Sequence, residues 1–128
     1  MLAGHIGSGA FAKRVTVVDE RREFIPEDYA GCRVDILVGY RRAEGIEIAT
    51  RTMSPDVIIT DELSGDDAVG VSGVLRSGVP LIASAHAADY SELTKKPSLI
   101  PILDSGVFSI AVGISRTGMG YSLKVDRF

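Results

Sequence analysis

The sequence predicts an α/β domain whose parallel sheet is followed by an antiparallel hairpin. Three short apolar runs predict buried strands, because they lack the polar and apolar alternation of half-exposed strands. They are Arg14–Val18, Val57–Thr60 and Leu81–Ser84. Helical stretches separate them, and strands that alternate with helices are typical of a layered fold with a parallel sheet. Near the C-terminus, Val107–Ile114 and Tyr121–Val125 predict a hairpin with Gly118 and Gly120 in its turn.

In two segments of the N-terminal third, the apolar residues follow neither helical nor strand periodicity. Residues 1–13 are rich in glycine and alanine, which predicts a flexible loop, with a frayed helix end before it as the alternative. Residues 14–128 then form the folded domain. Residues 21–40 are charged and irregular, so we expect a surface excursion there. Within it, Val34–Val38 is either a short strand or a turn.

The spacing of apolar residues, together with residues that typically start or end helices, predicts four helices. The expected ranges are Arg41–Met53, Asp66–Arg76, Tyr90–Lys95 and Ser98–Ser105. Ser54–Pro55 ends the first, because the residue before a proline disfavours the helical region. Ser64 or Asp66 caps the second, and Gly78 ends it. Pro97 separates the last two.

Composition excludes several classes of protein. With 128 residues, 45% hydrophobic and 24% charged, the chain has the composition of one globular domain and is too short for two. Its net charge of -3 offers no basic surface for DNA or RNA. The single cysteine, Cys32, excludes an internal disulfide and suits a reducing cytoplasm. Val107–Ile114 is far shorter than the roughly 20 residues of a membrane helix, so we expect a soluble protein that can dock on a membrane partner.

Polar residues follow all three predicted strands. They are Asp19-Glu20, Asp61-Glu62 and Ser84-Ala85-His86. Ligands of parallel α/β sheets bind beyond the carboxyl ends of the strands, where these residues converge. One carboxylate pair at a strand end is common, but three polar strand ends indicate a site.

The run Val57–Glu62 fits a Walker B element, in which a buried strand carries an acidic residue to the edge of the sheet. Asp61 would then hold the water shell of Mg²⁺, and Glu62 would orient or deprotonate an attacking water. The alternative is that both carboxylates only solvate or cap the following loop.

His86 and five arginines are further candidates. His86 would sense a γ-phosphate or the attacking water. Without further context, a histidine that only satisfies its hydrogen bonds within a strand-to-helix loop is the more common case. Arginine side chains bind phosphate oxygens of their own or a neighbouring subunit's nucleotide, although most are solvated surface charges. The candidates are Arg21, Arg22, Arg41, Arg42 and Arg51, of which Arg51 is favoured because its helix leads into the Walker B strand.

A phosphate-binding loop of the form G-x-x-x-x-G-K-[ST] is missing. Gly4 and Gly9 have the glycine spacing, but Ala10 and Phe11 stand where lysine and serine or threonine are required. No strand precedes this segment, so we reject it as a phosphate loop.

Taken together, several motifs resemble the stage III sporulation protein AA family in order and spacing. They are Val17–Phe24, Ala30–Cys32, Arg42–Gly45, Arg51–Glu62, Ile82–Ala87 and Ser105–Phe108. The resemblance covers the chain from about Lys13 to its C-terminus. It implies a RecA-like, three-layer P-loop ATPase core related to the type II and type IV secretion and pilus-retraction motors. It also implies ATP and Mg²⁺ as cofactors and a hexameric ring.

The resemblance implies a place in the cell as well. It points to the cytoplasm of the mother cell, at the membrane periphery, with membrane-embedded channel proteins between mother cell and forespore as partners. Matched residue by residue, Asp61 and Glu62 take the Walker B places, and His86 takes that of the histidine box. Asp19, Glu20 and Arg21 resemble the nucleotide-facing acidic box. Arg51, with Arg41 or Arg42, resembles an arginine box that acts on a neighbouring site.

Two departures from the family pattern shape our expectation. Family members carry the glycine-rich Walker A loop and an N-terminal domain upstream of the first strand, and the segment between Cys32 and Arg42 is shorter here. We therefore expect residues 14–128 to be the Walker B half of an ATPase domain, truncated at its N-terminus and weakly active or inactive alone. Uncovered apolar surface would make it self-associate. The alternatives are a non-catalytic assembly module of a ring or membrane complex, and a secretion or pilus ATPase relative outside sporulation.

Overall fold

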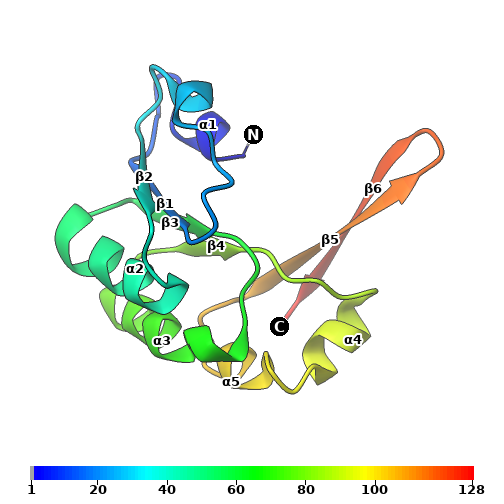
Figure 1. The fold of residues 1–128 in the computed structure, drawn as a ribbon. Helices are drawn as coiled ribbons and strands as arrows, with labels where there is room; N and C mark the ends of the chain where they lie inside the picture. Colours follow the sequence, from blue (N-terminus) through cyan, green and yellow to red (C-terminus); the bar gives the residue numbers. More distant parts are fainter. Residues whose placement is uncertain (1) are drawn as a thin grey trace.

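A four-stranded parallel sheet in the order β2-β1-β3-β4 forms the centre of the computed structural model, which describes residues 2–128 (Figure 1). The strands are β1 Val15–Asp19, β2 Val34–Val38, β3 Val57–Thr60 and β4 Leu81–Ala83. Val15 pairs with Val34 on one side and Val57 on the other, so β1 lies inside the sheet and all its residues are buried. Because all four strands run the same way, their carboxyl ends share one edge.

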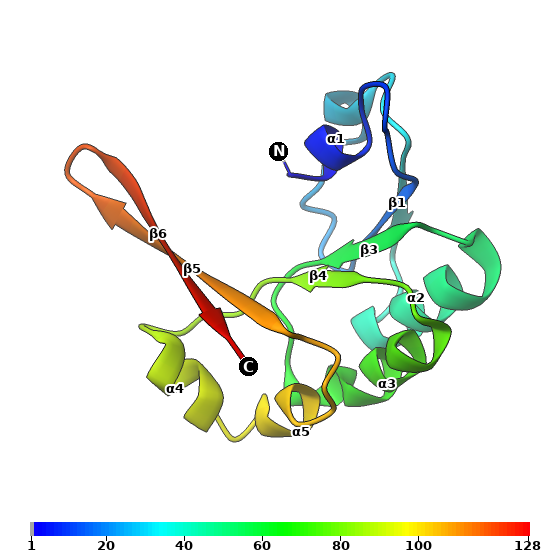
Figure 2. The same ribbon diagram turned by 180° about the vertical axis from the view of Figure 1, so that it is seen from behind.

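Helices cover one face of the sheet (Figures 1 and 2). They are α2 Arg42–Ile48, which continues as the π-helical turn η2 Ala49–Met53, α3 Ala68–Ser77 and α5 Ile100–Leu103. Val18 and Ile58 point from the strands into this layer and pack with Ile46 and Val71. The other face carries α1 Leu2–Ile6 and the 3-10 turn η1 Pro26–Tyr29, where Ala3 and Tyr29 pack on the sheet.

Two glycines bring the helices close to the sheet and to each other. A Cβ on Gly45 would lie 2.5 Å from Cγ1 of Val18, so α2 rests directly on β1. A Cβ on Gly70 would lie 2.6 Å from the backbone oxygen of Ala43, so the start of α3 abuts the start of α2. These contacts fix where the first residue of α2, Arg42, lies relative to the edge of the sheet.

The predicted strands and helices are present, but several of their bounds differ. The first predicted helix becomes π-helical from Ala49 to Met53, and the hairpin strands span Ile110–Thr117 and Gly120–Arg127, so Gly120 lies in a strand and not in the turn. Val34–Val38 is a strand, and Leu2–Ile6 is a helix with Ala3 buried where the sequence predicts a loop. The last predicted helix is shorter, spanning Ile100–Leu103. The 3-10 turn η3 Gly65–Asp67 precedes α3, and Ser64 caps it through a capping box whose partner is Asp67.

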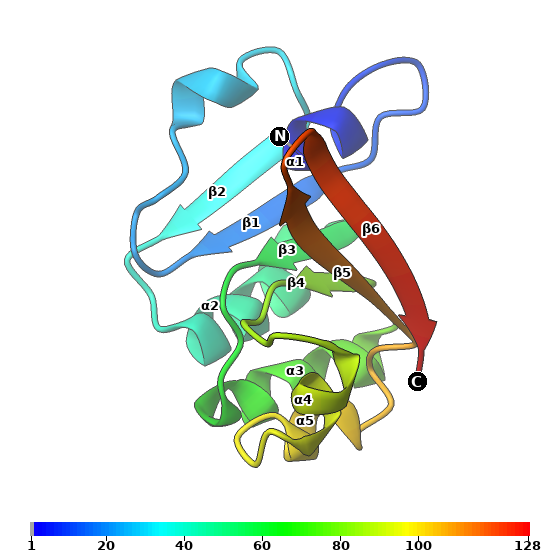
Figure 3. The same cartoon turned by 90° about the vertical axis from the view of Figure 1, so that its right-hand side faces the viewer.

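The C-terminal hairpin extends away from the sheet (Figures 1 and 2), and Figure 3 shows its two strands in front of the sheet. Its strands are β5 Ile110–Thr117 and β6 Gly120–Arg127. The α-helix α4 Tyr90–Lys95 lies near its base, where the Tyr90 hydroxyl donates to the Arg127 backbone oxygen at 2.9 Å. Val112 faces Val125 across the hairpin and lies on one face with it, and both are more than half exposed.

Within residues 2–128, no helix has the length and apolar character needed to span a membrane.

Candidate functional site

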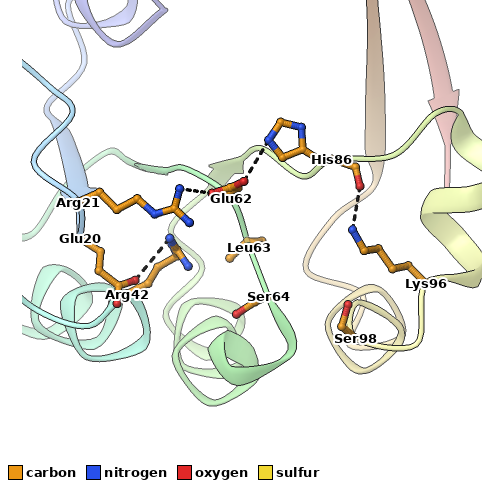
Figure 4. Close-up of a pocket in the computed structure, with 9 residues that line it drawn as sticks. All are labelled: Glu20, Arg21, Arg42, Glu62, Leu63, Ser64, His86, Lys96 and Ser98. Atoms are coloured by element: carbon orange, nitrogen blue, oxygen red, sulfur yellow. Dashed lines mark hydrogen bonds and ion pairs between the residues drawn. The ribbon is translucent and has the colours of Figure 1, made fainter.

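The polar residues that follow β1, β3 and β4 meet at the carboxyl edge of the sheet. They form an open pocket of about 390 Å³ with residues of the loop between α4 and α5 (Figure 4). Its lining consists of Glu20, Arg21, Arg42, Glu62, Leu63, Ser64, His86, Lys96 and Ser98. A smaller neighbouring pocket is lined in part by Asp61 and Ser84. The expected convergence of three strand ends is therefore found, at the edge where α/β sheets bind ligands.

Glu62 lies between a guanidinium and an imidazole (Figure 4). Its Oε2 is 2.6 Å from Nη1 of Arg21, and its Oε1 is 3.0 Å from Nε2 of His86. The backbone of Glu62 has a φ of 36°, in the left-handed region that a residue with a Cβ rarely adopts. Its N–H donates to Oγ of Ser84 at 2.9 Å, which helps to hold this conformation. Strained backbone of this kind is concentrated at functional sites.

Arg42 is buried among three carboxylates. Its Nη2 lies 3.3 Å from Oδ1 of Asp61 and 3.4 Å from Oε2 of Glu20, and its Nη1 lies 3.2 Å from Oδ2 of Asp67. Burial lowers the pKa of Arg42, but the hydrogen bond to Asp67 and the three negative charges outweigh it, so the pKa lies above its ordinary value. The guanidinium is thus a permanent cation at the centre of the site.

Asp19 accepts hydrogen bonds from the loop after β1 and does not line the pocket. It is fully buried, and its two oxygens accept hydrogen bonds from the backbone N–H groups of Glu23 and Phe24, each at 3.0 Å. Asp19 is not among the residues that line the pocket. The sequence suggests a nucleotide-facing carboxylate, but in the structure Asp19 shapes the loop that presents Glu20 and Arg21.

The candidate arginines fall into two groups. Arg21 and Arg42 line the pocket, whereas Arg22 is exposed and does not line it. Arg41 is exposed just before α2, and Arg51 is exposed on η2, where it pairs with Glu47 at 2.9 Å. Exposure suits a residue that reaches a neighbouring subunit, so Arg41 and Arg51 meet that requirement and the buried Arg42 does not.

Sequence reasoning missed four residues of the site, namely Ser64, Asp67, Lys96 and Ser98. The sequence predicts Ser64 only as a helix cap, and the capping-box spacing of Ser64-x-x-Asp67 could also have placed Asp67 at the start of that helix. Lys96 donates from Nζ to the backbone oxygen of His86 at 3.0 Å and brings a further cation to the pocket. No local motif marks Lys96 or Ser98, because only the fold of the loop between α4 and α5 brings them to the strand ends.

The donor set fits a hydrated cation beside phosphate oxygens. Glu20, Asp61 and Glu62 supply carboxylates, and Arg21 and Lys96 supply cations at the same edge. Within residues 2–128, no cluster of three or more histidine, cysteine, aspartate or glutamate side chains is arranged to hold a metal ion directly. Mg²⁺ in general keeps several of its waters and binds through one or two carboxylates together with phosphate oxygens.

The glycines of the N-terminal segment lie far from the strand ends that carry the site. The backbone oxygen of Gly7 accepts from Arg33, and that of Ile6 accepts from Lys13, beside the amino ends of β2 and β1. Gly4 packs near Tyr29 on the sheet. This segment does not line the pocket, in line with its rejection as a phosphate loop.

The site lies within a segment that known proteins share. The family model described as sporulation stage III, protein AA, matches residues 8–121. The chain belongs to this family. The stage III sporulation protein AA of Bacillus subtilis (strain 168) is 36% identical in an alignment of 107 residues that covers 78% of this chain and 35% of that protein. An uncharacterized protein, ycf45, of Cyanidium caldarium is 28% identical in an alignment of 116 residues that covers 82% of this chain and 33% of that protein.

The chain thus spans about a third of the length of both relatives. No solved structure matches it. Family membership supports a role in sporulation, and every pocket residue from Glu20 to Ser98 falls inside the matched segment.

Proposed function

We propose that the chain is the Walker B half of a RecA-like ATPase site in a sporulation protein. The observation that carries the proposal is the meeting of Asp61, Glu62 and His86 at one edge of a parallel sheet, beside Arg21 and Arg42. An acidic pair directly after a buried strand is where ATPases of this kind hold magnesium and activate water.

The proposed roles follow from the contacts. Asp61 would hold the waters of a bound Mg²⁺, and that ion would neutralise phosphate charge. Glu62 accepts a proton from the attacking water, and it does so once its ion pair with Arg21 opens. His86, whose side chain is largely exposed, contacts Glu62 and lies where it can sense a phosphate. Arg21 and Lys96 bind phosphate oxygens from two sides of the pocket.

Other parts of the assembly supply what this chain lacks. The phosphate loop would come from a polypeptide segment outside these 128 residues, since no G-x-x-x-x-G-K-[ST] run is present. In a ring, such as a hexamer, the exposed Arg41 and Arg51 would reach a neighbouring nucleotide. We extend the proposal to membrane-embedded sporulation channel proteins as partners, in the mother-cell cytoplasm at the membrane periphery.

A second candidate function is a non-catalytic assembly module. The observation that favours it is the exposed apolar face of the hairpin, where Val112 lies opposite Val125 and Ile114 opposite Leu123. Large exposed apolar patches mark interaction surfaces. Such a module would use its surface and would not need Glu62.

Sporulation of Bacillus subtilis separates the two functions. The segment of its stage III sporulation protein AA that matches this chain would be replaced by this chain, either unchanged or with Glu62→Gln. Glu27→Gln, an exposed carboxylate outside the pocket, is the matched control. An ATPase predicts that Glu62→Gln abolishes heat-resistant spores while Glu27→Gln does not. An assembly module predicts spores with both variants.

A further inference from the structure

The guanidinium of Arg42 joins the two ends of the loop that carries Glu62. Asp61 begins this loop directly after β3, and Asp67 closes it just before α3. Nη2 of Arg42 lies 3.3 Å from Asp61, and Nη1 lies 3.2 Å from Asp67. One planar side chain therefore holds both ends of a loop whose second residue has the left-handed backbone conformation.

Stability alone is a weak explanation for this arrangement. Only 7% of the Arg42 side chain is exposed, and its Nε is buried without a hydrogen-bond partner in the described chain. Leaving a buried donor unpaired costs free energy. Buried ion clusters can often be replaced by apolar side chains without loss of stability, so such a cluster is better explained by the geometry that it specifies.

The rest of the loop depends on the same arrangement. Asp67 also accepts from the backbone N–H and the hydroxyl of Ser64, so the capping box shares its carboxylate with Arg42. The backbone N–H groups of Glu62 and Leu63 both bind Ser84, on the neighbouring strand end. The loop is thus fixed by Arg42 at its two ends and by Ser84 in its middle.

We infer that Arg42 is a positioning residue: it orients the Asp61 carboxylate and holds the loop so that Glu62 faces the pocket. It acts inside its own chain and does not reach a neighbouring subunit. The chemistry assigned to Asp61 and Glu62 rests on the proposed function, whereas the positioning itself does not. Loss of Arg42 would leave Glu20, Asp61 and Asp67 facing one another without a counter-ion.

Amide hydrogen exchange of the 128-residue chain, followed by NMR without nucleotide, tests the inference. Arg42→Lys keeps the charge but cannot bridge two carboxylates with a planar group. We expect Glu62 and Leu63 to exchange about tenfold faster or more, while β1 amides change by less than about twofold, because local opening is distinct from global opening. Arg51→Met, at an exposed arginine, should change neither set of amides.

Two results would overturn the inference. One is exchange of Glu62 and Leu63 at the wild-type rate in Arg42→Lys, which would mean that positive charge alone suffices. The other is equal acceleration in β1, which would mean that Arg42 only supports the fold. If Arg42→Lys does not fold, Asp67→Asn decides, since it weakens one end of the bridge and must also accelerate exchange in the loop. If the loop responds but Glu62→Gln leaves sporulation intact, positioning stands and the proposed ATPase function fails.

Discussion

Oε1 of Glu62 lies 3.0 Å from Nε2 of His86, and this contact joins the ends of β3 and β4 across the pocket. Glu62 makes this contact from a left-handed backbone, with a φ of 36°. An alanine at this position would keep that strain, and a glycine would not, because only glycine lacks the Cβ that clashes there.

We therefore expect Glu62→Gly to be more stable than Glu62→Ala by about 1 kcal/mol. Both variants lose the carboxylate and its partners, so the comparison isolates backbone strain. Chemical denaturation of the two variants measures the difference. Equal stabilities would mean that the left-handed conformation of Glu62 is not strained in this fold.

Two glycines of α3 should respond to alanine in opposite directions. A Cβ on Gly70 would lie 2.6 Å from the Ala43 backbone oxygen and 2.9 Å from its Cα, so Gly70→Ala should destabilise the protein by about 2 kcal/mol. A Cβ on Gly73 meets nothing within 4 Å, so Gly73→Ala should stabilise by about 0.5 to 1 kcal/mol through helix propensity. Thermal unfolding of both variants tests the close packing of α3 on α2. Similar effects of the two substitutions would contradict it.

We expect Asp56 to stabilise the folded protein in a pH-dependent way. The Arg14 backbone N–H donates to its Oδ2 at 2.7 Å, and this hydrogen bond is the main reason why the pKa of Asp56 lies below its ordinary value of 3.8. A lowered pKa means that the folded state favours the charged carboxylate, so the stabilisation is present above pH 3.8 and is lost as the pH falls through the folded-state pKa.

Asp56→Asn should therefore lower the unfolding temperature near neutral pH, with the gap to wild type closing in acid. Asp35→Asn removes the same charge from an exposed position of β2 and serves as the control. Thermal melts from neutral to acidic pH follow both variants. A gap for Asp56→Asn that stays constant as the pH falls would show that the carboxylate charge is not the cause.

The apolar face of the hairpin predicts self-association of the chain. Val125 is 64% exposed on this face, and Ser122 lies on the opposite face of the same strand. Val125→Lys should shift the chain toward monomer in sedimentation velocity, while Ser122→Lys should not, since only the first places a charge in the apolar surface. An equal effect of both lysines would point to net charge and not to the apolar face.

The strands of the central sheet could be predicted because a buried parallel strand has a short, continuous run of apolar residues in the sequence. Val57–Thr60 has the predicted bounds. Val34–Val38 was ambiguous, because it is a half-exposed edge strand with Asp35 among its apolar residues. The helix predicted for Arg41–Met53 changes to a π-helical turn at Ala49–Met53, and no sequence motif records this change.

The site could be predicted in outline but not in the role of each carboxylate. Asp19 and Asp61 both end a buried strand and are followed by glutamate, so local pattern cannot separate them. In the structure their roles differ. The backbone N–H groups of Glu23 and Phe24 donate to Asp19, whereas Arg42 binds Asp61. Arg42 is buried at the start of α2, next to the close approach of Gly70 to Ala43, and no sequence motif records either feature.

The most direct test of the central claim is magnesium-dependent ATP hydrolysis by the Bacillus subtilis protein that carries this chain in place of its matching segment. We predict that Glu62→Gln retains ATP binding and lowers the hydrolysis rate by about a hundredfold or more, as loss of a general base does. Glu27→Gln should hydrolyse ATP at the rate of the unchanged chain. A hydrolysis rate in Glu62→Gln equal to that of the unchanged chain would contradict the assignment of this strand end as the water-activating half of an ATPase site.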